Sequence, residues 1–235
     1  MDTIFTLATP VCLPIVDQLK TFPVRRIYCV GRNYTDHVRE MGIQSPLEPP
    51  FFFCKPSDAQ SIVPVKAGQV EHIPYPPQTK NYHHEIELVV AIGKGGSNIS
   101  KEDAESHILG YAVGLDMTRR DLQLDMRNQG RPWEIGKAFD YSAPIGPIRL
   151  KEGVPHPLRG AIRLKVNGET KQIADLASMI WSVEDAISHL SAYFELQPGD
   201  LLFMGTPAGV GPVAKGDSLA GTIDNLVPLR VKIMD

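Results

Sequence analysis

Short apolar runs, separated by glycine, proline and polar residues, dominate the hydrophobic pattern of this 235-residue chain. Apolar runs of this length, bounded by turn-forming residues, are typical of β-strands. The pattern predicts strands at Ile27–Val30, Phe51–Cys54, Ile86–Ile92, Tyr111–Leu115, Ile162–Val166, Leu201–Met204 and Leu229–Ile233. Asn167-Gly168 follows the fifth of these runs, and because both residue types tolerate positive φ, the pair predicts a tight hairpin.

Three further segments repeat apolar residues at helical spacing, each after a residue that can cap a helix. The first follows Asn33 and ends at Gly42, the second follows Thr118, and the third starts at Ser182. Asp185 lies three residues after Ser182, as in a capping box. Many short strands with few short helices predict an α+β or mainly-β fold, without regular strand–helix alternation.

The length suits one sizeable domain. Residues 1–23 show no clear pattern and are predicted to be a lead-in to a main domain at residues 24–235. Trp133, Trp181 and the aromatic run "PPFFF" ending at Phe53 are most simply interpreted as core.

The composition narrows the expected partners and compartment. A net charge of −3 gives no electrostatic reason to expect nucleic acid or an anionic membrane. No apolar run approaches the roughly 18 residues of a membrane span, and the N-terminus lacks the basic segment of a secretory signal. Cys12, Cys29 and Cys54 share no metal-ligand spacing, so they are expected to be reduced thiols of a cytoplasmic protein.

Two glutamates interrupt a stretch that otherwise reads as a buried strand. Glu85 and Glu87 are two residues apart and therefore point to the same face of the strand. Asp116 follows another apolar run and can supply a third carboxylate. Three carboxylates without cysteine favour a hard divalent ion, Mg²⁺ first, with Mn²⁺ or Ca²⁺ as alternatives. The competing interpretation places Glu85 and Glu87 at the solvated end of the strand, with no metal.

His37 and Glu40 are three residues apart on the first predicted helix and therefore share one of its faces. A carboxylate that accepts a proton from one imidazole nitrogen leaves the other nitrogen free to act as a base. The alternative is an ordinary charged helix surface. The spacing alone does not choose between the two.

Two glycine-containing stretches carry further candidates. "FMGTPAGVG" lacks the lysine ending of a phosphate loop, which excludes that nucleotide site, but its backbone N–H groups and Thr206 can approach a small anion. A tight connection between strands explains it equally well. In "WEIGKAFD", Lys137 is either an active-site cation or a solvated lysine.

Together, these stretches resemble the fumarylacetoacetate hydrolase superfamily. The resemblance covers the chain from about Arg25 onward and includes "GRNYTDHVREMG", "HHEIELVVAIG", "GYAVGLDMTRRDLQ", "GRPWEIGKAFDYSAP" and "LQPGDLLFMGTPAGVG". It implies a mixed β-roll or sandwich, usually a homodimer, with a catalytic domain from residue 24 to the end. Gly136 stands where alanine is expected in many relatives, which leaves the role of Lys137 unchanged.

The resemblance also implies the site. Glu85, Glu87 and Asp116 are expected to hold Mg²⁺ or Mn²⁺, and His37 with Glu40 to activate water. Lys137 is expected over the substrate, and Arg120, Gln123 and Thr206 are candidates for its 2-oxo-carboxylate end.

The expected reaction is hydrolysis of a carbon–carbon bond in a 2,4-diketo acid, most closely fumarylpyruvate in gentisate catabolism. Arg32, Lys55 and Arg131 are candidates for the second carboxylate of such a substrate. The alternatives are oxaloacetate decarboxylation, hydration or isomerisation of an unsaturated 2-oxo acid, and a noncatalytic β-rich binding protein.

Overall fold

The structure is a computed structural model that describes residues 3–6, 8–42, 48–154, 156 and 159–234. Every strand predicted from the apolar runs is present, with ends shifted by at most three residues. They are β3 (Arg26–Gly31), β4 (Phe51–Lys55), β8 (Ile86–Ile92), β9 (Ile108–Leu115), β13 (Ala161–Val166), β15 (Asp200–Phe203) and β18 (Leu229–Ile233).

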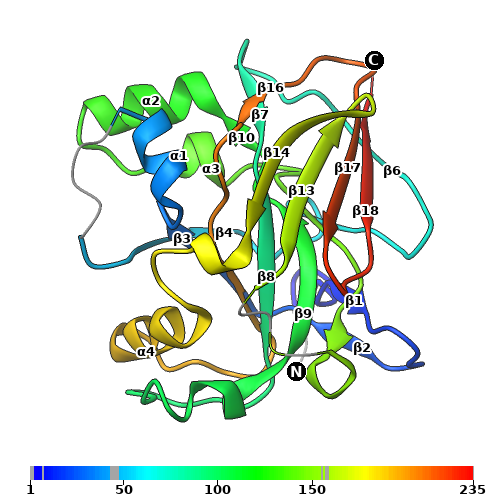
Figure 1. Ribbon diagram of the computed structural model, residues 1–235. Coiled ribbons are helices and arrows are strands. Elements are labelled where there is room, and N and C mark those ends of the chain that lie inside the picture. Colours follow the sequence, from blue (N-terminus) through cyan, green and yellow to red (C-terminus); the bar gives the residue numbers. More distant parts are fainter. Residues whose placement is uncertain (1–2, 7, 43–47, 155, 157–158, 235) are drawn as a thin grey trace.

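Two sheets form most of the fold. The larger has the strand order β4-β3-β15-β8-β9-β11-β5, with β12 paired to β9, and the second has the order β14-β13-β17-β18-β6. Figure 1 shows β13, β14, β17 and β18 in front of the long central strands β8 and β9. The strands of these two sheets that the apolar runs did not predict are β5 (Ile62–Pro64), β6 (Glu71–Ile73), β11 (Ala143–Ile145), β12 (Arg149–Leu150), β14 (Glu169–Asp175) and β17 (Ser218–Ile223).

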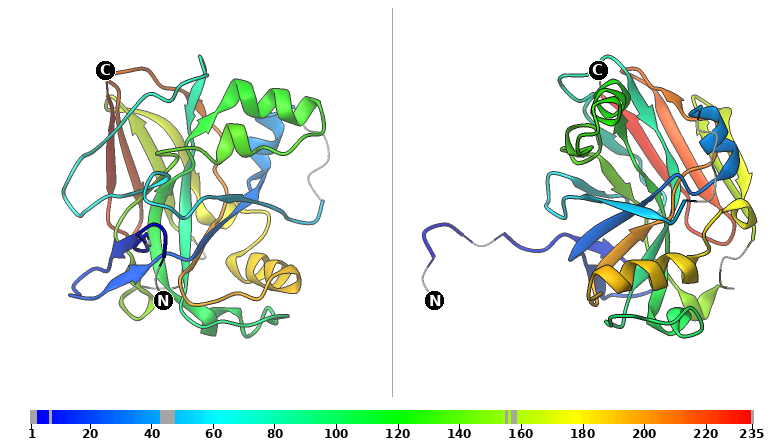
Figure 2. Two further views of the ribbon diagram at one scale, coloured as in Figure 1. Left: turned by 180° about the vertical axis from the view of Figure 1, so that it is seen from behind. Right: turned by 90° about the vertical axis from the view of Figure 1, so that its left-hand side faces the viewer.

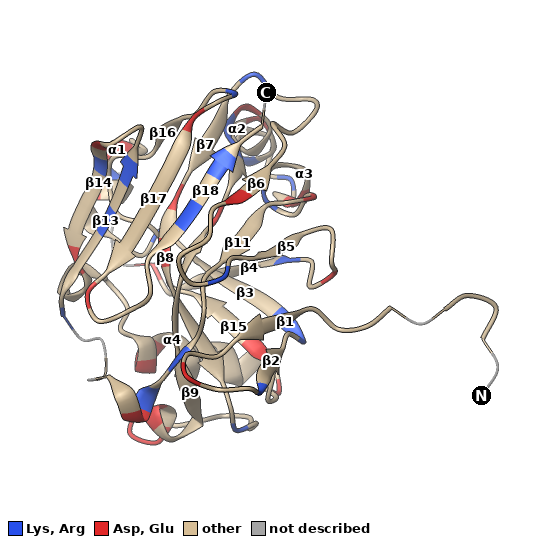
Figure 3. Cartoon of the chain, turned by 90° about the vertical axis from the view of Figure 1, so that its right-hand side faces the viewer, with Lys and Arg blue, Asp and Glu red and all other residues tan. Residues whose placement is uncertain are grey.

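The hairpin predicted at Asn167-Gly168 joins β13 to β14, and both residues have positive φ, 50° and 83°. Strand β18 shows the alternation of a sheet with one solvated face: Leu229, Val231 and Ile233 are buried, whereas the residues between them are exposed. Figure 3 shows those basic positions in blue along β18. The alternation of apolar and basic residues along β18 in the sequence therefore indicates which face of this sheet is buried.

Strand β8 is covered on both faces. Ile86 and Leu88 belong to the larger apolar core, between the two sheets, whereas Val89 and Ala91 belong to a smaller core on the opposite face. A hairpin of β1 (Cys12–Pro14) and β2 (Thr21–Pro23) contributes to that smaller core. The sequence predicted no structure in this hairpin, and the domain boundary at residue 23 stays a prediction.

The described helices are short and lie on one side of the molecule, as the two views of Figure 2 show. The α-helices are α1 (Thr35–Glu40), α2 (Arg120–Asn128), α3 (Glu134–Lys137) and α4 (Val183–Tyr193), and the 3₁₀ turns are Ala104–His107, Lys151–Gly153 and Leu176–Ser178. The capping box of Ser182 and Asp185 is confirmed at the start of α4. No helix in the described part of the chain is both long and apolar enough to span a membrane.

The predicted caps of the first two helices are wrong. Tyr34 is the N-cap position of α1, and the side chain of Asn33 instead bonds the backbone of Trp181 and Met204. Thr118 lies in β10 (Thr118–Arg119), the strand before α2. Asn33 satisfies distant backbone groups, and the Thr118 hydroxyl donates to the carbonyl of Asp116 and accepts from Lys137, contacts that a cap prediction from local sequence does not include.

A small sheet brings α2 close to the start of β8. In it, β7 (Tyr82–His84) pairs with β10 on one side and with β16 (Gly211–Pro212) on the other. Because β7 directly precedes β8 and β10 directly precedes α2, this sheet positions helix α2 beside the two glutamates. The described free cysteines are Cys29, which is buried, and Cys12 and Cys54, which are exposed.

Candidate active site

The three predicted carboxylates meet at the ends of β8 and β9. The backbone N–H of Asp116 donates to the carbonyl of Glu85 at 2.8 Å, because β8 and β9 pair in antiparallel register up to this point. One carboxylate oxygen from each of Glu85, Glu87 and Asp116 lies within 4.8 Å of the others, and all three residues are buried. The alternative that the glutamates lie in solvent is therefore wrong.

Buried cations contact two of the three carboxylates. The Lys137 ammonium lies 2.8 Å from Glu85 Oε2 and 2.5 Å from Asp116 Oδ2, and it also donates to the Thr118 hydroxyl. Burial alone would raise the pKa of Glu85, but Lys137 and Arg120 outweigh that cost and hold this pKa well below its usual range. Lys137 is therefore a buried ammonium and not a solvated surface lysine.

Glu87 forms no ion pair with any lysine or arginine in the described part of the chain. Its Oε2 accepts a hydrogen bond from the backbone N–H of Gly205 at 2.7 Å. Burial, together with the nearby Asp116 and Glu85, raises the pKa of Glu87 well above its usual value. A buried carboxyl that is costly to ionise, facing two other carboxylates, fits a divalent cation with oxygen ligands. Mg²⁺ and Mn²⁺ both suit this donor set.

Gly205 reaches Glu87 because it has no side chain. Its φ is +85°, and a Cβ there would lie 2.7 Å from the Cβ of Asn33. The glycine-rich segment after β15 therefore serves as a close backbone approach to a carboxylate. The sequence indicated an anion contact in this segment, and the anion proves to be the protein's own side chain.

His37 and Glu40 form the predicted pair on α1. His37 Nδ1 lies 3.1 Å from Glu40 Oε2, and the Glu40 carboxylate also accepts the N–H of Gly209 at 3.1 and 3.2 Å. Because a carboxylate only accepts, Nδ1 carries the hydrogen and Nε2 is left as an acceptor. The buried His37 is therefore no part of a solvated helix surface.

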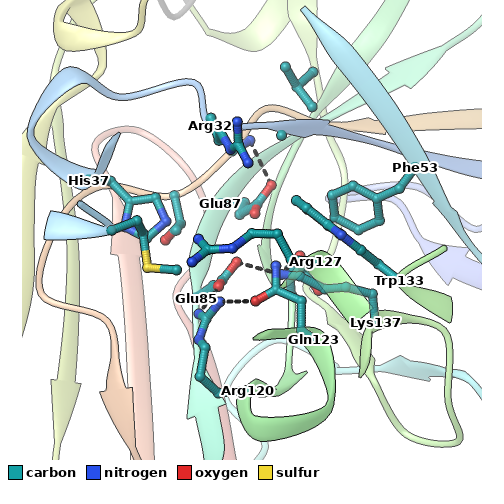
Figure 4. Close-up of a pocket in the computed structure, with 16 residues that line it drawn as sticks. Arg32, His37, Phe53, Glu85, Glu87, Arg120, Gln123, Arg127, Trp133 and Lys137 are labelled. Atoms are coloured by element: carbon teal, nitrogen blue, oxygen red, sulfur yellow. Dashed lines mark hydrogen bonds and ion pairs between the residues drawn. The ribbon is translucent and has the colours of Figure 1, made fainter. Parts of the chain in front are cut away.

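These groups share one pocket, drawn in Figure 4. Its walls include nine of the predicted residues: Arg32, His37, Glu85, Glu87, Asp116, Arg120, Gln123, Lys137 and Thr206. Glu40 stands behind His37. Lys55 lies behind Asp116, where its ammonium is 2.7 Å from Asp116 Oδ1 and also bonds the carbonyl of Lys137. Arg131 does not line the pocket.

One face of helix α2 forms a wall of the pocket. Arg120 bonds Glu85 and donates to Gln123 Oε1 at 2.5 Å. Arg127 lies seven residues after Arg120 and also lines the pocket. The spacing 120, 123, 127 describes one helical face and could have revealed Arg127 in the sequence.

Thr206 is held by Gln172, which the sequence analysis missed. The Thr206 hydroxyl donates to the carbonyl of Ile86 and accepts from Gln172 Nε2, both at 2.8 Å. Its hydroxyl is thus occupied, whereas its backbone N–H has no acceptor among the described residues. Gln172 comes from β14 of the second sheet, just where the β13–β14 register shifts. No local signal marks this glutamine.

Two of the aromatic residues predicted as core form part of the outer wall of the pocket. Trp133 and Phe53 line the pocket and are only partly buried. The Trp133 ring lies 5.3 Å from the ring of Phe51, edge-on, and 5.9 Å from that of Phe53. The core assignment is wrong for Trp133 and Trp181, which are partly buried and belong to neither of the two described cores, whereas Phe52 and Phe53 pack against the larger and the smaller core. Aromatic side chains suit a pocket wall as well as a core.

Comparison with known proteins agrees with this geometry. The family described as fumarylacetoacetate (FAA) hydrolase C-terminal matches residues 26–234. The chain belongs to the fumarylacetoacetate hydrolase family.

Fumarylpyruvate hydrolase from a Ralstonia species is 44% identical over 191 residues, 81% of this chain and 96% of the relative. The human mitochondrial oxaloacetate tautomerase is 41% identical over 209 residues, 89% of this chain and 91% of the relative. The crystal structure of fumarylpyruvate hydrolase from Pseudomonas aeruginosa, in complex with Mn²⁺ and pyruvate, is 58% identical, with a TM-score of 0.96 and 99% of each chain covered.

These relatives confirm the predicted family and the mainly-β fold. They also confirm the enzyme class: the protein is a hydrolase acting on carbon–carbon bonds. A noncatalytic binding protein is therefore excluded.

Proposed function

We propose that this enzyme hydrolyses the C3–C4 bond of a 2,4-diketo acid, with fumarylpyruvate as the preferred substrate and fumarate and pyruvate as the products. The observation that carries this proposal is the meeting, in one pocket, of the His37–Glu40 pair and the three buried carboxylates. A base for water and a cation site for a 2-oxo acid are the two parts that such a hydrolysis needs. The Ralstonia and Pseudomonas relatives support this choice of substrate.

Glu85, Glu87 and Asp116 would hold the divalent ion. When bound, Mn²⁺ or Mg²⁺ supplies a Lewis acid for the oxygens of the 2-oxo acid. The P. aeruginosa relative was crystallised with Mn²⁺ and pyruvate, which supports both the ion and the product. Burial of all three carboxylates keeps competing water away from the ligands.

His37 is the proposed base. Glu40 fixes the imidazole with Nδ1 protonated, so Nε2 can take a proton from a water molecule that attacks C4. The water oxygen bonds to C4, the C3–C4 bond breaks, and its electron pair leaves with C3. Protonation of C3 gives pyruvate, and C4 becomes the new carboxyl group of fumarate.

Two groups of the chain are placed to stabilise negative charge on the substrate. Lys137 stays charged, because Asp116 and Glu85 outweigh the effect of burial and raise the pKa of its ammonium. All three of its N–H groups have acceptors, so an oxyanion would replace one of them. Thr206 offers its backbone N–H to the carboxylate end of the substrate.

The test replaces His37 by Gln and follows the disappearance of diketo-acid absorbance with fumarylpyruvate. General base catalysis typically contributes about 100- to 10,000-fold, so kcat should fall within that range. His72→Gln is the matched control, because His72 is exposed on β6 outside the pocket. Full activity of the His37 variant would remove it from the mechanism.

A second candidate reaction is keto–enol conversion of oxaloacetate, favoured by the 41% identity with human oxaloacetate tautomerase. It needs proton transfer at C3 but no attacking water. Comparing kcat/KM for fumarylpyruvate, acetylpyruvate and oxaloacetate would rank the two reactions. Loss of CO₂ from oxaloacetate, measured in the same assay, would reveal the decarboxylase alternative.

The biological setting belongs to the same proposal. Fumarylpyruvate as substrate would place the enzyme in gentisate catabolism in the cytoplasm, and the family resemblance implies a homodimer. Sedimentation of the purified protein would test the dimer.

A further inference from the structure

The outer part of the pocket holds a cation with no partner in the network described above. Arg127 lines the pocket but forms no side-chain hydrogen bond or ion pair with any residue that the structure describes. Figure 4 shows its guanidinium turned into the pocket, away from the axis of its own helix. It is partly buried, so its charge is neither fully hydrated nor neutralised.

The other cations near the pocket are already engaged. Lys55, Lys137 and Arg120 each contact a carboxylate of Glu85 or Asp116. Arg32 lies 3.9 Å from the exposed Glu48, and its guanidinium is 5.3 Å from the centre of the Phe51 ring. Among these groups, Arg127 has the charge most available to a ligand.

Helix geometry sets the distance between the two ends of the pocket. Arg120 bonds the carboxylate cluster, and Arg127 follows it by seven residues on the same face, which is about 10 Å along the helix axis. A seven-carbon diketo acid in an extended conformation has a similar length. An anchor at the cluster therefore leaves the far end of such a chain near Arg127.

We propose that Arg127 is a specificity-determining residue that binds a second carboxylate at the far end of the acyl group. The enzyme then prefers dicarboxylic over monocarboxylic 2,4-diketo acids. This inference rests on the proposed function. An arginine guanidinium binds a carboxylate through two parallel hydrogen bonds, so it selects a ligand by both its charge and its geometry.

The wall beside Arg127 suits the middle of the same substrate. Trp133 and Phe53 line the same pocket as Arg127, and Figure 4 shows their rings next to one another on one side of the carboxylates. A flat, conjugated acyl segment can lie against such rings, and its terminal carboxylate then extends toward Arg127. A short uncharged acyl group reaches no cation and leaves the guanidinium in water.

The experiment measures kcat/KM for fumarylpyruvate and acetylpyruvate in the wild-type enzyme, Arg127→Met, Arg32→Met and Arg131→Met. A charge-assisted hydrogen bond of ordinary strength predicts a loss of about 10- to 100-fold for fumarylpyruvate in Arg127→Met, mostly as a higher KM. Acetylpyruvate should change less than about twofold. Arg131→Met is the matched control, since Arg131 is exposed, lies just beyond the end of α2, and does not line the pocket.

Two further measurements keep the result decisive. Arg127→Lys should recover part of the lost discrimination, because it restores the charge but not the fork. Fumarate should inhibit the wild-type enzyme more strongly than Arg127→Met, whereas inhibition by pyruvate should be equal in both.

The outcomes separate the two proposals. Equal losses for both substrates in Arg127→Met, or a selective loss only in Arg32→Met, would overturn this inference and leave the proposed function standing. Failure of the wild-type enzyme to cleave either diketo acid would overturn the proposed function itself.

Discussion

The inner and outer ends of the pocket are built on different principles. At the inner end, Glu85 and Asp116 are buried, and every lysine or arginine that contacts them is buried as well. At the outer end, Arg127 and Trp133 are partly exposed, and Arg127 has no protein partner among the described residues. Each charge in a buried ion network needs a partner, because an unpaired buried charge destabilises the folded state. A half-exposed cation is partly hydrated and can remain unpaired until a ligand binds.

This difference indicates that the inner end carries the catalytic chemistry and that the outer end determines substrate specificity. Substitutions at the inner end should reduce turnover of every substrate, and those that remove a cation should also lower stability, because they leave a buried carboxylate less compensated. Substitutions at the outer end should change the choice between substrates and leave the folded state unaffected. The following predictions test that division.

The largest effect is expected at the inner end, for Glu87→Gln. Loss of a metal ligand should reduce kcat/KM by more than about 100-fold, because substitution of a residue that only supports a ligand can already cost about 100-fold. Stability without metal should not fall, because the glutamine removes a charge that burial, Asp116 and Glu85 disfavour. The stabilisation of the wild-type protein by Mn²⁺, measured by thermal unfolding, should disappear in the variant.

Glu169→Gln, at an exposed position on β14, is the control for this change and should keep the Mn²⁺ effect. The raised pKa of Glu87 sets the direction in which Mn²⁺ binding changes with pH. A proton competes with the ion for this carboxylate, so Mn²⁺ should bind more weakly as pH decreases. A Glu87→Gln protein that is stabilised by Mn²⁺ as strongly as the wild type would contradict the metal site.

An intermediate effect is expected for Lys55→Met. Lys55 is buried and contacts Asp116 Oδ1 behind the pocket, so its removal leaves this buried oxygen without its cation, and only Lys137 still contacts the carboxylate, at Oδ2. The free energy of unfolding should fall by about 3 kcal/mol, and kcat/KM should fall for all substrates alike. Denaturant unfolding measures the first quantity, with exposed Lys66→Met as the control.

The same variant tests the earlier assignment of Lys55 to the substrate. A rise in KM for fumarylpyruvate alone, with unchanged stability, would show that Lys55 contacts the substrate and not the network.

The smallest effect is expected at the outer end, for Trp133→Leu. The substitution keeps an apolar wall but removes a flat ring surface, worth about 1 kcal/mol beyond its area. Less than about a tenfold loss of kcat/KM is expected for fumarylpyruvate, and a smaller one for acetylpyruvate. A large loss for both, with reduced stability, would mean that Trp133 supports the inner network and that the two ends are not separate.

The site shows which relations between residues can be predicted from local sequence patterns. The two-residue spacing of Glu85 and Glu87 placed them on one face of a strand, and the three-residue spacing of His37 and Glu40 placed them on one face of a helix, although only the family resemblance predicted that the latter two form a pair. These relations lie within single strands or helices, whose periods are known. Arg127 was within reach by the same logic, because it continues the face of Arg120 by helical spacing.

The sequence by itself determined seven of the strands, the hairpin at Asn167-Gly168, the capping box of α4 and the main polar groups of the site. Only the tertiary structure decided that Asn33 links three segments, that Gln172 of the second sheet holds Thr206, and that Lys55 lies behind Asp116. Periodicity records which face a residue occupies on its own element. Which distant element packs on that face depends on strand pairing and burial across the whole chain, and no local pattern carries that information.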